Sequence, residues 1–257
     1  MNYEEVEGVN WSSLKNMHPS PKNMQSFLRS KRRDTAQMAL GRAVHCALLE
    51  PERFELNFCV KPKFDLRRNG EREALAKWEE EHSESEHITQ AQLETAFRCR
   101  EAIANHEIAS FFIPGDDPER AIFWEDELTG LKCKARVDTL KGGVVDLKTT
   151  TQENLAAILR DAARRMYHGQ SAWYHHAAVE DGLIDGSRLP VNVFVQTVEP
   201  FDVAVLRMTE ETFEEGTLLW RSLLDQYAGC LKMDWWPGMA EEDVPWTLPR
   251  WAKMERC

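Results

Sequence analysis

The chain of 257 residues is 42% hydrophobic, which is enough to bury a sizeable core in one large domain or two small ones. Its formal net charge of −11 argues against a protein that coats nucleic acid non-specifically, although a local basic groove can lie on an acidic body. No segment approaches the ~18 consecutive apolar residues of a membrane span, and the acidic start M-N-Y-E-E-V-E lacks the apolar core of a signal peptide.

The first part of the chain, residues 1–115, is predicted to be mainly helical. A short helix with a serine cap begins in V-N-W-S-S-L, and the sequence P-S-P ends it. Apolar residues at i, i+3 and i+4 spacing, followed by Pro51, predict a helix over residues 35–50. Thr89 and Gln92 form a capping box for another helix. This last helix is expected to run over about 90–105. Two further helices are expected in this part, one that ends near residue 30 and one that covers 71–82.

The second part, residues 116–257, begins with strands. A hairpin is predicted over residues 121–138, because two strand-like stretches flank a Thr-Gly turn, and the strand G-G-V-V-D-L-K follows. Thr150 and Glu153 are expected to cap the next helix. The later elements are expected to be helices to about 166 and over 168–181, strands over 191–198 and 203–208, and a helix over 210–231 before an aperiodic tail. This order indicates an α/β fold in a single domain of residues 1–257: a central mixed sheet flanked by helices, with the helical N-terminal region packed on it.

Two acidic residues and a lysine fall on adjacent strands. In V-V-D-L-K the strand period of two places Val144, Asp146 and Lys148 on one face, and Asp138, at the end of the preceding strand, can reach the same spot. Burying two carboxylates and an ammonium costs several kcal/mol unless they pair or bind a metal ion. The set is therefore either a catalytic metal centre or a charged hairpin of the kind that proteins commonly carry by chance.

Two residue pairs on helices could complete such a centre. Gly41 and His45 lie four residues apart on one helix face, where the glycine lets another backbone approach and the histidine offers a ring nitrogen. A lone histidine on an apolar helix face is otherwise an ordinary core residue. Gln170 and Tyr174 share one face of the helix that follows the D-x-K strand, and their alternative interpretation is a plain amphipathic helix.

Two basic clusters are candidates for contacts with DNA phosphates. The first covers Arg29–Arg33 and includes Arg32 and Arg33, and the second covers Lys61–Arg68. Arg67 and Arg68 are the arginines of the second cluster. Either cluster is equally well interpreted as solvent-exposed charge.

The six cysteines include no C-x-x-C pair, so their spacing encodes neither a zinc site nor an iron–sulfur cluster. Scattered thiols in a chain without a secretion signal indicate the reducing cytoplasm. We therefore expect a cytoplasmic protein with no membrane partner.

In chain order the motifs are G-x-x-x-H, D, D-x-K and Q-x-x-x-Y, and this combination resembles the RecB-like branch of the PD-(D/E)XK nucleases. A closer resemblance, to the RecE (exodeoxyribonuclease VIII) family, covers nearly the whole chain. The segments that carry it are S-S-L-K, L-G-R-A-V-H-C-A-L-L-E-P-E-R-F, K-P-K-F-D-L-R-R-N-G, R-V-D, V-D-L-K-T-T, Y-H-x-Q-x-A-W-Y, W-W-P-G and L-P-R-W-A.

The resemblance implies a PD-(D/E)XK nuclease core and a role for each motif. His45, Asp138, Asp146 and the backbone carbonyl of Leu147 would bind Mg²⁺, with Mn²⁺ as a substitute. Lys148 would hold or deprotonate the attacking water and offset charge in the transition state. Glu125, on the first strand, is a further ligand candidate. Gln170 and Tyr174 would contact DNA or brace the site.

The function implied by the resemblance is a metal-dependent exonuclease that degrades one strand of linear double-stranded DNA from its ends, 5′→3′. It would leave 3′ overhangs for a single-strand annealing protein in phage-type recombination, and it would act as a ring-shaped homo-oligomer. The resemblance implies that the cytoplasm is that of a bacterium or of a phage-infected host cell. Two alternatives stay open: a RecB-like or CRISPR-associated single-strand exonuclease, and a non-catalytic DNA-binding module that retains the fold. The acidic net charge favours the non-catalytic module, and the intact D…D-x-K set favours an enzyme.

Overall fold

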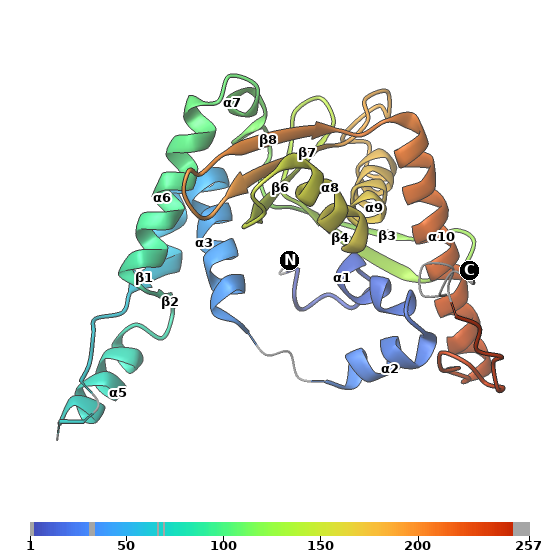
Figure 1. The fold of residues 1–257 in the computed structure, drawn as a ribbon, viewed down its shortest axis with the longest axis horizontal. Helices are drawn as coiled ribbons and strands as arrows, with labels where there is room; N and C mark the ends of the chain where they lie inside the picture. Colours follow the sequence, from blue (N-terminus) through green and yellow to red (C-terminus); the bar gives the residue numbers. More distant parts are fainter. Residues whose placement is uncertain (1–2, 31–33, 66, 69, 249–257) are drawn as a thin grey trace, which may run out of the picture.

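The computed structural model describes residues 3–30, 34–65, 67–68 and 70–248, with a mixed sheet at its centre (Figure 1). The helices are α1 (Trp11–Leu14), α2 (Pro21–Arg29), α3 (Ala36–Leu49), α4 (Phe54–Asn57), α5 (Glu71–Glu81), α6 (Gln90–Asn105), α7 (Ala109–Phe112), α8 (Leu155–Arg164), α9 (Tyr167–Glu180) and α10 (Glu210–Met233). The strands are β1 (Phe58–Val60), β2 (Glu86–Ile88), β3 (Arg120–Glu125), β4 (Lys132–Val137), β5 (Thr139–Leu140), β6 (Val144–Thr150), β7 (Val191–Gln196) and β8 (Val203–Arg207). Two short 3-10 turns, Lys15–Met17 and Pro51–Arg53, follow α1 and α3.

The central sheet has the strand order β5-β6-β7-β8. β6 and β7 are parallel and are connected through α8 and α9, whereas β5 and β8 run antiparallel to their neighbours. β3 and β4 form the predicted hairpin. The predicted α/β class, a mixed sheet flanked by helices, is confirmed. The parallel pair of β1 and β2 was not predicted, because strands of three residues are too short to show a period.

The side chains of β6 alternate between two apolar clusters. Val145 and Leu147 are buried in a cluster that also contains residues of α3 and α6. Val144 is buried on the opposite face with Trp173 of α9 and Trp220 of α10. The strand period of two therefore directs the two polar residues of D-x-K toward α9, on the face that the sequence predicts they share with Val144.

Two helix caps differ from the prediction. Asn10, not a serine, caps α1: its Oδ1 accepts from the Ser13 amide at 2.9 Å, and Ser13 closes the capping box. Asn154 caps α8 by accepting from the Ala157 amide at 3.0 Å. Thr150 is the last residue of β6 and pairs with β7, so it is not available as a cap. The capping box of Thr89 and Gln92 is present as predicted.

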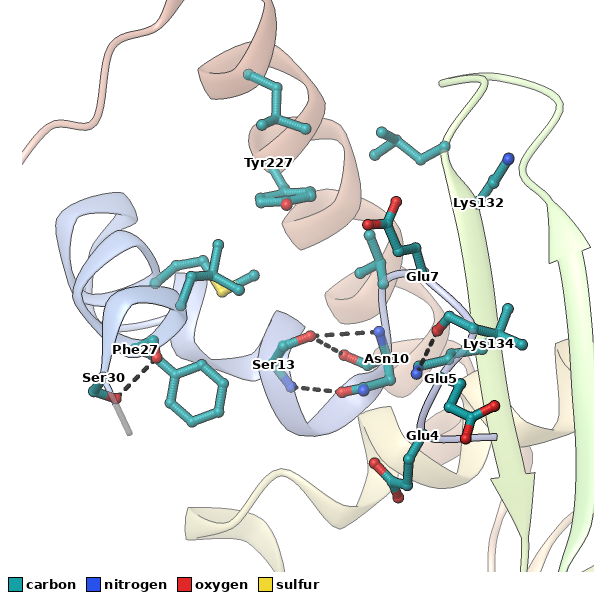
Figure 2. A pocket seen from close by; sticks show the side chains of 17 residues that line it. Glu4, Glu5, Glu7, Asn10, Ser13, Phe27, Ser30, Lys132, Lys134 and Tyr227 are labelled. Carbon is teal, nitrogen blue, oxygen red and sulfur yellow. Dashed lines mark hydrogen bonds between the residues drawn. The ribbon is translucent and has the colours of Figure 1, made fainter. Parts of the chain in front are cut away.

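The segment before α1 lies along β4 and forms one wall of a pocket of about 670 Å³, whose other walls come from α2 and α10 (Figure 2). Lys134 is almost fully buried and donates hydrogen bonds to the carbonyls of Tyr3, at 2.9 Å, and Val6, at 2.8 Å. A buried ammonium needs such acceptors, because an unpaired charge is costly to desolvate. The N-terminal segment is therefore fixed to the strand that leads toward Asp138.

α5 lies away from the central sheet, at the end of an arm that also carries the loop after β1 (Figure 1). The arm leaves the body at the β1–β2 pair. Lys61 at its base forms an ion pair with Glu79 of α5, with 2.7 Å between Nζ and Oε1. In the part of the chain that the structure describes, no helix has the length and apolarity needed to cross a bilayer.

α9 and α10 pack so closely that Gly216 of α10 touches backbone. A Cβ at residue 216 would lie 2.4 Å from the carbonyl oxygen of His168. Because backbone cannot move aside as a side chain can, we expect Gly216→Ala to lower the free energy of unfolding by about 1–3 kcal/mol, measured by urea denaturation. Gly229→Ala on the same helix is the control: its Cβ would meet only the end of Met233, at 3.9 Å, and it should stabilise by roughly 0.5–1 kcal/mol. Equal effects of the two substitutions would contradict this packing.

Candidate metal centre and active site

Asp138 is the residue between β4 and β5, and its carboxylate reaches the edge of β6. β5 pairs with only Val144 and Val145 of β6, so the next part of this edge has no strand partner. The Asp138 Oδ2 accepts the amide of Leu147 at 2.7 Å and takes the place of that partner. The Leu147 carbonyl faces the same edge, because the N–H and C=O of one strand residue point in the same direction, and it interacts with the His45 ring.

His45 of α3 and Glu119 lie next to Asp138. The His45 Nδ1 is 3.7 Å from the Asp138 Oδ2 and 4.0 Å from the Glu119 Oε1. One potential ligand atom from each of the three residues falls within 4.8 Å of the other two. Carboxylate oxygens and an imidazole nitrogen in this arrangement suit Mg²⁺ or Mn²⁺.

Glu119 was not predicted. It precedes β3 with a φ of 53°, and its amide donates to the Asp138 carbonyl at 2.9 Å. Its other carboxylate oxygen is 3.0 Å from the Arg136 Nε. The preceding G-D-D-P gives no periodic signal, so the sequence offers only an acid close to a strand, and a positive φ at a glutamate is not readable from composition.

Asp146 and Lys148 form a buried ion pair on the α9 side of the sheet. The Lys148 Nζ is 2.5 Å from the Asp146 Oδ2, and the two side chains are 13% and 1% exposed. Asn192 of β7 donates to the same Oδ2 at 3.0 Å and is itself hydrogen-bonded to Ser171 of α9. The Asp146 Oδ1 is buried and has no hydrogen-bond partner among the described residues. A fully buried carboxylate oxygen without a donor fits a cation ligand, because desolvating it is otherwise uncompensated.

The charges of the site interact strongly. Burial, helped by the Lys148 ammonium, lowers the pKa of His45 to about 4. Burial and the Asp138 carboxylate raise the pKa of Glu119 to about 7. Burial raises the pKa of Asp138 and of Asp146 despite the nearby lysine. Burial lowers the pKa of Lys148, but the two aspartates together outweigh it and raise this pKa. At neutral pH the imidazole is thus neutral, with a free lone pair, and the amine is a cation.

α9 contributes aromatic residues to the same region. The Gln170 Nε2 donates to the Tyr174 hydroxyl at 2.8 Å, so the predicted pair does share one face. Burial, together with Asp146 and Asp138, raises the pKa of Tyr174 far above its ordinary value, which keeps the phenol neutral. Tyr167, which the sequence analysis did not single out, lies under the Lys148 Nζ with 4.8 Å from the nitrogen to the ring centroid.

Other predicted site residues lie elsewhere. Glu125 is exposed and pairs with Lys132, at the opposite end of the hairpin from Asp138. At ~3.4 Å per residue this is about 17 Å away, so the candidate ligand at β3 is Glu119 and the prediction for Glu125 is wrong. Arg67 and Arg68 are exposed on the arm, where Arg68 pairs with Asp65 at 3.3 Å, and the structure does not bring them to the site. Arg32 and Arg33 lie outside the described residues.

The two glutamates at opposite ends of β3 provide a direct test of this centre. We expect Glu119→Gln to weaken Mn²⁺ binding roughly tenfold or more, because a neutral amide replaces an anionic ligand. Glu125→Gln should bind Mn²⁺ as the unmodified protein does. Isothermal titration calorimetry at constant pH measures both. Equal losses in the two variants, or no loss in Glu119→Gln, would place the cation somewhere else.

Comparison with known proteins agrees with this architecture. Residues 10–243 match the family described as a PDDEXK-like domain of unknown function (DUF3799). A crystal structure of a protein from Eubacterium rectale, described as a putative exonuclease, has 14% sequence identity and a TM-score of 0.58, with 89% of this chain and 82% of that chain covered. At this identity the likeness shows the fold alone. A search of curated proteins found no similar sequence. Because the family match covers most of the residues, the chain belongs to the PDDEXK-like DUF3799 family and has the PD-(D/E)XK nuclease fold that its sequence predicts.

Proposed function

We propose that this chain is a metal-dependent exonuclease that hydrolyses phosphodiester bonds of linear double-stranded DNA from the ends. The observation that carries the proposal is the buried pair of Lys148 and Asp146. The Asp146 Oδ1 has no hydrogen-bond partner among the described residues, and the Asp146 carboxylate interacts electrostatically with Asp138 and His45 of the group formed by His45, Glu119 and Asp138. The family match and the likeness to a putative exonuclease support nuclease chemistry in general. We propose Mg²⁺ as the physiological ion, with Mn²⁺ as a substitute.

Each side chain of the site has a function in this proposal. His45, Glu119, Asp138, Asp146 and the Leu147 carbonyl would hold the ion, which supplies an acidified water and polarises the phosphate. Asp146 fixes the Lys148 ammonium at 2.5 Å, so the amine is oriented before substrate arrives. A fixed cation in a buried site stabilises the charge that develops on the phosphate oxygens, because no solvent must reorganise around it. Tyr174 and Gln170 brace this region from α9.

The finer parts of the proposal rest on the resemblance to the RecE family. They are degradation in the 5′→3′ direction, 3′ overhangs for phage-type recombination, a single-strand annealing protein as partner, and a ring-shaped homo-oligomer in the cytoplasm. We propose that the whole chain forms one nuclease domain, since residues of α3, β6 and α9 and the residue between β4 and β5 all contribute to the candidate site.

A non-catalytic DNA-binding module is the second candidate, and the net charge of −11 is the observation that favours it. The free Asp146 Oδ1 argues against it. A module without a cation gains nothing from a buried carboxylate oxygen that lacks a donor, because that oxygen costs desolvation energy.

We expect Lys148→Ala to reduce Mg²⁺-dependent degradation of linear duplex DNA by roughly 10²- to 10³-fold, the cost of removing one preorganised charge from a site of this kind. The far-ultraviolet circular dichroism spectrum should be unchanged. Lys77→Ala, which removes an amine that is 76% exposed on α5, is the matched control and should retain full activity. Undiminished activity in Lys148→Ala would reject the proposed active site.

Strand polarity and end dependence form a separate prediction. A linear duplex labelled at its 5′ ends should release labelled mononucleotides before a 3′-labelled duplex does, and a closed circular duplex should stay intact. The order of release follows from the proposed 5′→3′ direction, and the intact circle follows from the proposed requirement for an end. Faster digestion of single strands than of duplexes would favour the RecB-like alternative, and nicking of the circle would indicate an endonuclease.

A further inference from the structure

A second pocket, of about 460 Å³, lies at the end of the central sheet where β6 and β7 begin and β8 ends. α7 contacts β8 (Figure 1), and its Phe111 and Phe112 line one side of the pocket. Along β6, Asp146 and Lys148 are two and four residues from Val144 in the pocket wall. Val145 also lines the pocket and adjoins Asp146 in the chain, but none of the candidate metal ligands, nor Lys148, lines it, so the pocket is distinct from the candidate metal centre.

Three cationic side chains meet in this pocket, although the chain as a whole is acidic. They are Lys141, Arg188 and Arg207, and no acidic residue lines the pocket within the described ranges. Lys141 forms an ion pair with the 70% exposed Asp116 carboxylate at 3.5 Å. The two arginines are exposed and form no ion pair within 4.0 Å in the described structure, although Arg188 also helps to lower the pKa of the nearby Asp185. Two guanidinium groups without a close ion pair in one pocket indicate a site for an anion.

The Gly-Gly turn before β6 shapes this site. A Cβ at Gly143 would lie 3.2 Å from the Arg188 Cβ, and one at Gly142 would lie 3.0 Å from the Arg188 Nη1. Gly142 also has a φ of 65°, which L side chains rarely adopt. The two glycines therefore let the arginine lie directly over the turn. The metal centre gives no reason for this close approach.

Aromatic rings complete the pocket. The Arg207 guanidinium lies over the Phe112 ring, with 5.0 Å to the centroid, and the Lys141 Nζ lies 5.8 Å from the Phe111 centroid. Phe111 is 58% exposed. An exposed aromatic face beside cations is the combination that binds a nucleobase by stacking and its phosphate by hydrogen bonds.

We propose that this pocket binds a nucleotide, with the phosphate held by Arg188 and Arg207 and the base stacked on Phe111. The larger pocket in Figure 2 lacks this character, because three glutamates line it and its Lys134 already binds two carbonyls. The ligand is either a free nucleoside monophosphate or the phosphorylated end of a DNA strand, and these share the same chemistry. The inference goes beyond the proposed nuclease function and does not require a metal ion.

Calorimetric titration in EDTA tests it, since no strand can be cut and the metal centre stays unloaded. The probes are deoxyadenosine 5′-monophosphate, inorganic phosphate and deoxyadenosine. We expect the monophosphate to bind at least about tenfold more tightly than either part alone, because both halves of the pocket then contribute. No binding of the monophosphate at about 1 mM, or equal affinity for inorganic phosphate, would overturn the proposal.

Matched variants locate the binding. The double variant Arg188→Gln with Arg207→Gln should lose about tenfold or more in affinity for the monophosphate, because both phosphate donors lose their charge. Arg98→Gln is the control, as Arg98 is also exposed and also lies over a phenylalanine, Phe201, at 4.3 Å, but outside the pocket. Phe111→Ala should keep the affinity for inorganic phosphate and lose the preference for the nucleotide. Unchanged affinity in the double variant would refute the site.

A 5′-phosphorylated hexanucleotide separates the two sources of the ligand. Affinity equal to that of the monophosphate indicates a free nucleotide, and much tighter binding that the double variant abolishes indicates the end of a strand. Repeating the titration with Lys148→Ala distinguishes this inference from the proposed nuclease function. Nucleotide binding should survive in that variant whether or not the protein cleaves DNA.

Discussion

The hydrogen bond from the Leu147 amide to the Asp138 carboxylate is the contact on which the rest of the site depends. β5 ends after two residues, so β6 would otherwise present an unpaired edge beside Asp146. The side chain of Asp138 satisfies that edge at 2.7 Å, and its backbone carbonyl accepts the Glu119 amide at 2.9 Å. One residue thereby joins the end of β4, the start of β3 and the open part of β6. His45 then needs only the packing of α3 against the sheet to reach the same point.

Asp146 is held from the opposite direction, by β7 and α9. Asn192 is its register partner on β7 and donates to it at 3.0 Å, while Ser171 bonds to the asparagine at 3.1 Å. All three residues are buried. A buried polar network of this kind restricts the carboxylate to one orientation, because any rotation would break bonds that water cannot replace. The free oxygen of Asp146 is consequently fixed in place rather than disordered.

The sequence was sufficient where a periodic pattern or a local motif determined the structure. Alternation in V-V-D-L-K predicted that Asp146 and Lys148 share a face, and the i, i+4 rule predicted the contact of Gln170 with Tyr174. The sequence was insufficient where a single backbone angle or a strand register determined which residue lies at the site. Glu119 precedes β3 and Glu125 is its last residue. Only the positive φ of Glu119 and the pairing of Glu125 with Lys132 show which of the two acids lies near Asp138. Asn154 replaced Thr150 as a cap because β6 continues further than its composition suggests.

Arg136 divides its guanidinium between Glu119, at 3.0 Å, and Glu4 of the N-terminal segment, at 3.7 Å. A divalent ion that attracts the Glu119 carboxylate competes with this arginine for the same oxygens. Binding of the ion would then shift the Arg136 guanidinium from Glu119 toward Glu4. Glu4 belongs to the N-terminal segment that Lys134 holds through the carbonyls of Tyr3 and Val6. A change of charge at Glu4 would therefore alter the apparent affinity for the ion, although Glu4 is not a ligand.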